Sequence, residues 1–184
     1  MTTEVMKPGI ITRVRRVVVR SLLSDGTTPE PAPQDIVVTG VSDVPLTYVI
    51  QAGEQVIDRA DGVGVIAVHT EDDTLVGVDL NVITLEKDFL VNAIILGGRV
   101  EDRQWFPPTI GEQREAPARF SVDIYSRARS GGYLVYKYAY CMGVPRNVSR
   151  DNLVAVSGFV IKARPHPKTQ SVYHEELVDE LPNI

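Results

Sequence analysis

The stretch that decides the fold class is Leu75-Val76-Gly77-Val78-Asp79-Leu80-Asn81-Val82-Ile83. Its even-numbered residues are all aliphatic, whereas its odd-numbered positions include glycine, aspartate and asparagine. Alternation with a period of two is typical of a β-strand that has one buried face. We therefore expect one face of this strand to lie in a core and the other to meet water or a partner.

Other segments rich in β-branched and aromatic residues extend this pattern on both sides. They are residues 10–23, 36–39, 46–52, 54–59, 63–70, 118–125, 132–141 and 153–164. Asp61-Gly62 between two of them has the turn chemistry of a hairpin, and 129–132 predicts a second hairpin. Strands thus predominate.

One helix is expected, over residues 85–96, with Thr84 as its N-cap and Gly97-Gly98 as its end. The helix has an apolar stripe that we expect to pack on the sheet. The packing residues are Leu85, Phe89, Leu90, Ala93 and Ile94. A single helix is too little for βαβ units, so we predict a mainly β fold, an antiparallel β-sandwich or barrel with one flanking helix and long loops.

The 184 residues are expected to form a single domain with a core at about 36–165. Residues 1–9 are interpreted as a loose N-terminal arm. Residues 166–184 are interpreted as a C-terminal tail with one acidic helical turn over 173–181.

The sequence offers no signature of catalysis. Phosphate-binding glycine loops and the nucleophile elbow are absent, and the three histidines lack the spacing of metal ligands. The single cysteine, Cys141, lies in an apolar run that predicts a buried, inert thiol. We therefore expect a protein that is not an enzyme and has no cofactor, metal or catalytic residue. No apolar run reaches the roughly 18 residues of a membrane span, so we expect no membrane contact and assembly in the cytoplasm.

Charge is unevenly distributed along the chain. The net charge is +4 over residues 1–20, −8 over 36–98 and +5 over 99–165. One interpretation is that surfaces of opposite sign meet between copies in a head-to-tail assembly. The alternative is that folding interleaves these segments and the asymmetry disappears in space.

Residues 99–117 lack periodicity and contain four consecutive residues suited to an interface, Trp105, Phe106, Pro107 and Pro108. A large aromatic anchor on a stiff loop is typical of an interface hot spot, so we interpret this segment as an assembly loop. The alternative is that Trp105 folds back as a lid on the subunit's own core.

Two blocks of sequence carry a family resemblance. The first is residues 72–82, which lead into the expected helix and its glycine end. The second is residues 118–125, which continue through 140–151 to a last strand ending at 163–165. Their order resembles that of tail tube (major tail) proteins of long-tailed phages and related contractile systems, over residues 44–165.

The resemblance implies a viral structural protein of the virion tail, assembled in the host cytoplasm. Its subunits would form hexameric rings that stack into a tube for DNA ejection. The implied partners are other copies of the chain, tape-measure and tail terminator or tip proteins, and DNA in transient, non-specific passage. It implies no catalytic residues. Two alternatives remain: another viral or injection-machine assembly protein, such as a connector or terminator, or a small-molecule-binding or hydrolytic β-barrel.

Overall fold

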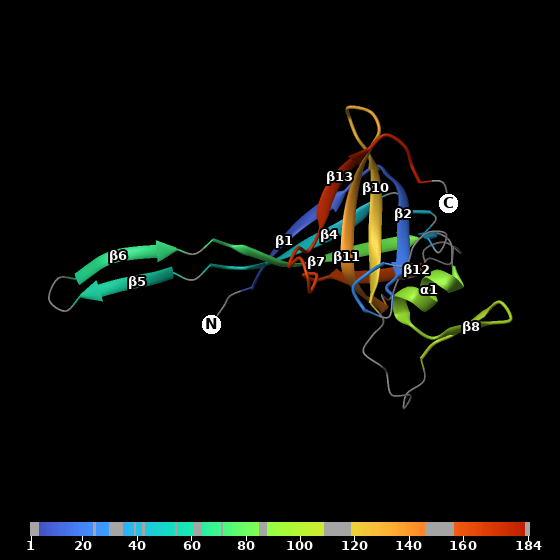
Figure 1. Ribbon diagram of the computed structural model, residues 1–184, viewed down its shortest axis with the longest axis horizontal. Helices are drawn as coiled ribbons and strands as arrows, with labels where there is room; N and C mark the ends of the chain where they lie inside the picture. The colour runs from blue at the N-terminus through green and yellow to red at the C-terminus, as the bar shows by residue number, and fades with distance from the viewer. Residues whose placement is uncertain are drawn as a thin grey trace, which may run out of the picture.

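A computed structural model describes residues 4–23, 25–29, 35–38, 40–41, 43–53, 55–60, 64–70, 72–84, 88–108, 119–145 and 157–182, with the backbone alone for 55–60, 64–70, 145 and 157. These residues form thirteen strands and one helix (Figure 1). All strand pairs are antiparallel, and the main sheet does not close into a barrel. The predicted mainly β, antiparallel fold is confirmed.

Nine strands form one open sheet that folds over into two layers. The first layer contains β1 (Glu4–Ile11), β4 (Val44–Gln51), β7 (Thr74–Thr84) and β12 (Ser157–Ala163). The second contains β11 (Tyr133–Pro145), β10 (Phe120–Arg127), β2 (Val14–Ser21), β3 (Ile36–Val38) and β13 (His174–Val178). The long strand β11 belongs to both, because its last five residues pair with β12 and its first five pair with β13.

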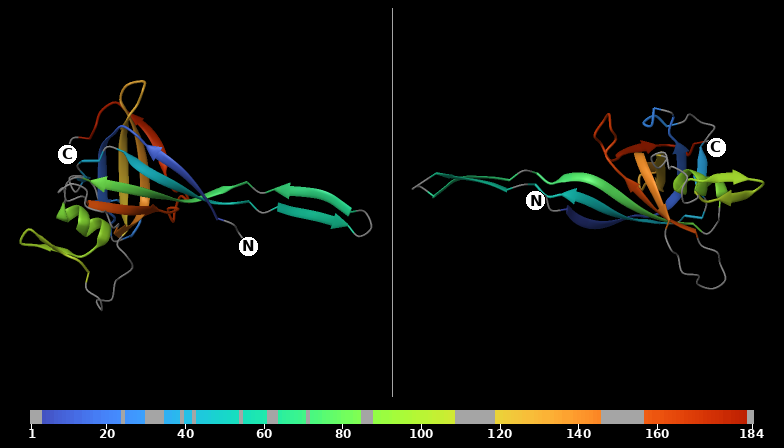
Figure 2. Two further views of the ribbon diagram at one scale, coloured as in Figure 1. Left: turned by 180° about the vertical axis from the view of Figure 1, so that it is seen from behind. Right: turned by 90° about the horizontal axis from the view of Figure 1, so that it is seen from below.

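The core lies between the two layers, whose strands cross at a steep angle in Figures 1 and 2. Aliphatic side chains from the strands of both layers are fully buried there, including Val17, Val78, Leu80, Val82 and Ile161. The expected alternation of β7 is therefore confirmed.

The helix α1 (Phe89–Leu96) begins later than the sequence predicted. Asp88 is its N-cap and accepts hydrogen bonds from the backbone N–H groups of Leu90 (2.8 Å) and Val91 (3.4 Å). The expected cap, Thr84, is instead the last residue of β7, and Leu85 lies outside the described residues. The expected glycine end is confirmed, since Gly97 follows the last helical residue with φ 78°.

The predicted packing face of α1 is partly wrong. The buried residues are Val91, Asn92 and Ile95, whereas Leu90 is 54% exposed. Phe89 and Ala93 are half-buried, and Ile94 packs against the core. The contact with β11 has a simple cause: a Cβ atom at Gly143 would lie 2.1 Å from the carbonyl oxygen of Ile95, so only glycine lets the helix approach so closely.

Both ends of the chain belong to the sheet. Residues 4–9, interpreted from sequence as a loose arm, are part of β1 and pair with β4. Residues 174–178 form the strand β13 rather than a helical turn. The core also extends beyond 36–165, because it contains Val17 and Val172. Local sequence could not reveal these pairings, because the partner strands lie far away in the chain.

The strands β5 (Gln55–Ala60) and β6 (Gly64–Thr70) form a separate hairpin, hereafter the arm. The arm projects from the body of the molecule along its longest axis (Figures 1 and 2). A second small hairpin, β8 (Arg99–Glu101) and β9 (Gln104–Phe106), lies with α1 on the side of the body away from the arm.

Candidate assembly surfaces

The arm is the first candidate surface. Its two strands were expected from sequence, but their projection away from the body was not. Among the described residues, β5 and β6 pair only with each other. At the base of the arm, the carboxylate of Asp73 accepts a hydrogen bond from the backbone N–H of Gly53 at 3.2 Å. This bond links the segment that leads into β5 to the segment that follows β6. An isolated two-stranded hairpin is only marginally stable in water. The arm therefore has the properties of an element that is completed by a partner.

The end strand β1 is the second candidate surface. It pairs with β4 on one side, and its other edge has no partner strand among the described residues. Three of its apolar residues are exposed: Val5 (38%), Met6 (57%) and Ile10 (58%). An exposed apolar edge strand is a template for pairing with another chain. Pro8, within the same strand, limits such pairing because it lacks an N–H donor.

The third candidate is the outer face of the first layer, on the opposite side from the core. The register places Thr47, Asp79 and Lys162 side by side on it. Its charge is low, because Arg164 covers Gly77 and forms an ion pair with Asp79 at 2.8 Å. The remaining described positions include Met6, Ile10, Asn81 and Ile83. This is the wet or partner-facing side that the alternation of β7 predicted.

The segment expected to be an irregular assembly loop begins instead as the β8–β9 hairpin. Asp102 (φ 47°) and Arg103 (φ 61°) form its two-residue turn, and consecutive positive φ angles are typical of a type I′ hairpin turn. Residues 109–117 lie outside the described residues.

The four candidate interface residues of this segment differ in exposure. Trp105 is half-buried, and its indole Nε1 donates a hydrogen bond to the carbonyl oxygen of Gly97 at 3.0 Å. Trp105 thus contacts the end of its own helix. Phe106 is 39% exposed beneath the guanidinium of Arg99, Pro107 is exposed and Pro108 is half-buried. Of the four, Phe106 and Pro107 are the most available to a partner.

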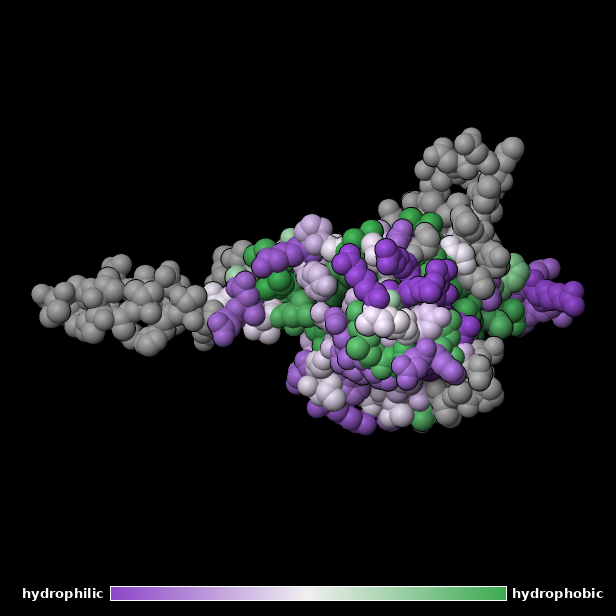
Figure 3. All heavy atoms as spheres, turned by 90° about the horizontal axis from the view of Figure 1, so that it is seen from above, coloured by the Kyte–Doolittle hydropathy of each residue, from purple (hydrophilic) through white to green (hydrophobic). Residues whose placement is uncertain are grey.

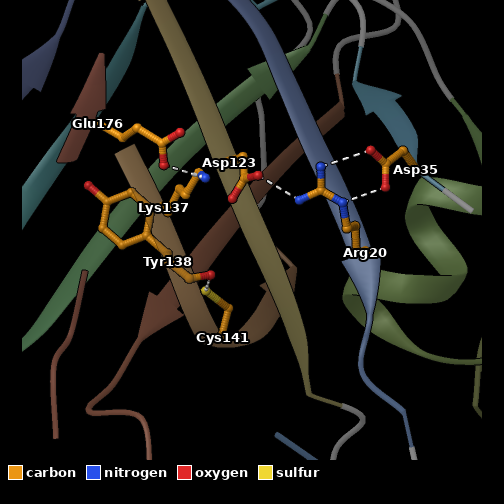
Figure 4. Close-up of polar contacts among 7 residues, drawn as sticks. All are labelled: Arg20, Asp35, Asp123, Lys137, Tyr138, Cys141 and Glu176. Carbon is orange, nitrogen blue, oxygen red and sulfur yellow. Dashed lines mark hydrogen bonds and ion pairs between the residues drawn. The ribbon is translucent and has the colours of Figure 1, made fainter. Parts of the chain in front are cut away.

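A cluster of three charged residues, which no sequence pattern predicted, links β2 to β10 and to the residue before β3 in the second layer (Figure 4). Arg20 on β2 binds both carboxylate oxygens of Asp35, next to β3, and one oxygen of Asp123 on β10 at 2.6 Å. The side chains of Asp35 and Asp123 are 5% and 9% exposed. The hydrogen bonds that Arg20 donates to Asp35 raise the pKa of Arg20, so its guanidinium stays charged. No local spacing predicted this cluster, because Arg20 and Asp123 are 103 residues apart.

The described residues contain few features of catalytic chemistry. No group of three or more His, Cys, Asp or Glu side chains that could hold a metal ion occurs among them. Cys141 is fully buried, and this burial raises the pKa of its thiol well above its usual range. Within the same part of the chain, no helix has the length and hydrophobicity needed to span a membrane.

No protein-family model matches this chain, and no curated protein matches its sequence.

Proposed function

We propose that this chain is a structural subunit that assembles with copies of itself into stacked rings, which form a tube that conducts DNA in a phage-type tail.

The observation that carries this proposal is the arm, which projects from a well-packed body and pairs only with itself. The resemblance to tail tube proteins supplies the expected form of the assembly.

The argument from the arm is energetic. A hairpin of two strands buries too little apolar surface to offset the entropy lost when its residues are ordered. A partner that packs on the arm would supply the missing contacts. The open sheet also favours association, because its end strand β1 has exposed apolar residues, Val5, Met6 and Ile10, and an edge without a partner strand among the described residues. A chain with two incomplete surfaces is suited to a contact that repeats from copy to copy.

The low charge on the outer face of the first layer is an argument for the proposed passage of DNA. A wall that conducts DNA must not bind phosphates tightly, since each Lys or Arg that neutralises a phosphate adds to affinity. On this face Arg164 is already paired with Asp79, and Lys162 is half-buried. A face of low net charge is therefore a suitable lining for the tube. Tape-measure and tail terminator or tip proteins remain proposed partners at its ends.

The test compares the full chain with a variant in which residues 54–71 are replaced by Asn-Gly, which keeps the Gly53–Asp73 contact. We expect the full chain to form rings and stacked tubes in negative-stain electron microscopy, and its mass in solution to rise with concentration. The shortened variant should remain a folded monomer with a similar melting temperature, because the arm is not part of the core.

Three outcomes would count against the proposal. A full chain that stays monomeric at high concentration would overturn self-assembly. Rings that never stack would favour the connector or terminator alternative. If the shortened variant forms the same tubes, the arm does not carry the assembly.

A further inference from the structure

The two strands of the arm have an apolar sequence without net charge. Together β5 and β6 contain three valines, two isoleucines and two alanines, but only one acid, Asp58, and one base, Arg59. Among the described residues no further strand pairs with either of them. The hydrophobic effect favours the removal of such residues from water, so the surface that best completes the arm is apolar as well.

The side of the body away from the arm has an exposed apolar surface, hereafter the helix patch. It contains Leu90 of α1, which is 54% exposed, Phe106 of β9, which is 39% exposed, and the exposed Pro107. The strand β9 lies against the end of α1, because the indole of Trp105 donates its hydrogen bond to Gly97 there. Figure 3 shows hydrophobic residues on this side of the body, next to the hydrophilic tip of the β8–β9 hairpin.

The charges around the helix patch nearly balance. Arg99 forms an ion pair with Glu101 at 3.1 Å, and Asp102 and Arg103 are neighbours in the turn between β8 and β9. The remaining acid, Asp88, caps α1, where the helix dipole favours its negative charge. A neutral arm and a nearly neutral patch are complementary, because their contact buries no unpaired charge.

The arm and the helix patch lie on opposite sides of one molecule, so they can meet only between copies (Figures 1 and 2). The strands of the arm have six and seven residues and span roughly 20 Å. The eight residues of α1 span about 12 Å, so the arm is long enough to cover the patch. The other exposed apolar element, β1, lies on the same side of the body as the arm (Figure 1).

We propose that the arm of one copy packs on the helix patch of a second copy. This inference rests on the proposed self-assembly and names the surface that receives the arm. Because the two surfaces differ, the contact is head-to-tail, and repeating it extends an assembly instead of closing a dimer.

The first test removes the apolar character of the helix patch. Leu90→Glu/Phe106→Thr should raise the concentration needed for assembly by about tenfold or more, as expected for a central apolar contact. The matched control is Leu177→Glu/Leu23→Thr, which changes two exposed apolar residues outside every candidate assembly surface and should leave assembly unchanged. Sedimentation velocity measures assembly, and thermal melting at low concentration shows that each variant is folded. If the double variant is unfolded, Leu90→Glu alone serves, because an acid in the first turn of a helix is favourable.

The second test asks directly which surfaces meet. Cys141 is fully buried, so an introduced cysteine is the thiol that reacts. A chain with Asp58→Cys on the arm, mixed with a chain carrying Gln104→Cys beside the helix patch, should give a covalent dimer with a short bis-maleimide. Each chain alone should give far less. The control mixture replaces Gln104→Cys by Glu175→Cys, on the exposed strand β13, and should give no dimer.

The docking is overturned if the patch variant is folded and assembles like its control. It is also overturned if the Asp58→Cys chain cross-links to Glu175→Cys, or to Lys7→Cys on β1, in place of Gln104→Cys. In each of these cases the unaltered chain still assembles, so the proposed function survives. Only a chain that never assembles would remove both.

Discussion

The body and the arm of this molecule are stabilised in opposite ways. The body buries aliphatic side chains between two crossing layers and holds its outer strands with a buried ion cluster. The arm consists of two paired strands that extend beyond any other strand of the structure. The core of the body is complete within one chain, whereas under the proposed assembly the arm gains its further contacts from a partner. If the proposed assembly is right, stability depends mainly on the body and assembly on the arm, so substitutions should affect the two properties separately.

The largest expected effect is on the core of the body. Phe120 is fully buried between the layers, and Phe120→Ala should lower the free energy of unfolding by about 3–5 kcal/mol. Urea denaturation of the arm-shortened chain measures this without interference from assembly. Leu177→Ala is the control, because Leu177 is 68% exposed and its loss should change little. A loss below about 1 kcal/mol for Phe120→Ala would contradict the two-layer core.

The ion cluster should have the next largest effect. Arg20→Ala leaves the carboxylates of Asp35 and Asp123 buried without their counter-ion, which should cost about 3 kcal/mol. Arg15→Ala, on the same strand but exposed, is the matched control and should be near neutral. If both variants melt at the same temperature, the cluster does not fasten the second layer.

Trp105 and Phe106 are adjacent aromatic residues that should differ in their contribution to the stability of the monomer. Trp105→Ala loses a hydrogen bond to Gly97 and half-buried ring surface, so it should destabilise the monomer by about 1–2 kcal/mol. Phe106→Ala should change monomer stability by less than about 0.5 kcal/mol, because Phe106 is 39% exposed and its ring is not part of the buried core. The same denaturation experiment measures both. Equal effects would show that the two rings do not differ in their contact with the body.

The smallest expected effect is a dependence on pH in the turn before β3. The carboxylate of Asp25 accepts hydrogen bonds from the side chain of Thr28 and from the backbone N–H groups of Thr27 and Thr28, which lower the pKa of Asp25. A lowered pKa in the folded state gives stability that is present above the ordinary aspartate range, about pH 4, and lost as the pH falls below it. Asp25→Asn should therefore be slightly less stable at pH 7, and the difference should shrink at pH 3. A difference that grows on acidification would reverse the sign of this linkage.

Local patterns predicted those parts of the fold that depend on neighbours in the chain. The alternation in β7, the glycine end of α1 at Gly97 and the hairpin at 129–132 all follow from residues within a few positions of one another. The two strands of the arm were expected for the same reason, since Asp61-Gly62 separates two β-rich segments.

The features that were missed depend on distant partners. β13 has the acidic sequence HEELV, which reads as a poor strand, yet it pairs with β11 and places Glu176 2.6 Å from the amine of Lys137. β1 contains Lys7 and Pro8 and is held by β4, some forty residues later. The helix packing face was misjudged because it depends on Gly143, a residue of another element. The sequence also did not show which of the candidate interface residues would contact the subunit itself. Trp105 does so by donating a hydrogen bond to a backbone carbonyl, which no pattern of side chains reveals.

The pairing of β2 with β10 has a consequence for the order in which the chain folds. Register partners such as Arg20 and Ser121 are separated by about a hundred residues, whereas β4, the arm and β7 are consecutive in the chain. Contacts between distant segments form slowly, because a long loop must close first. During synthesis, β1, β4 and β7 can pair before the second layer is complete. The core-facing side chains of Val78 and Leu80 then stay open to water until β10 and β11 leave the ribosome. Nascent chains at this stage are the ones most prone to aggregate, and the rate at which the last third of the chain is made sets how long they persist.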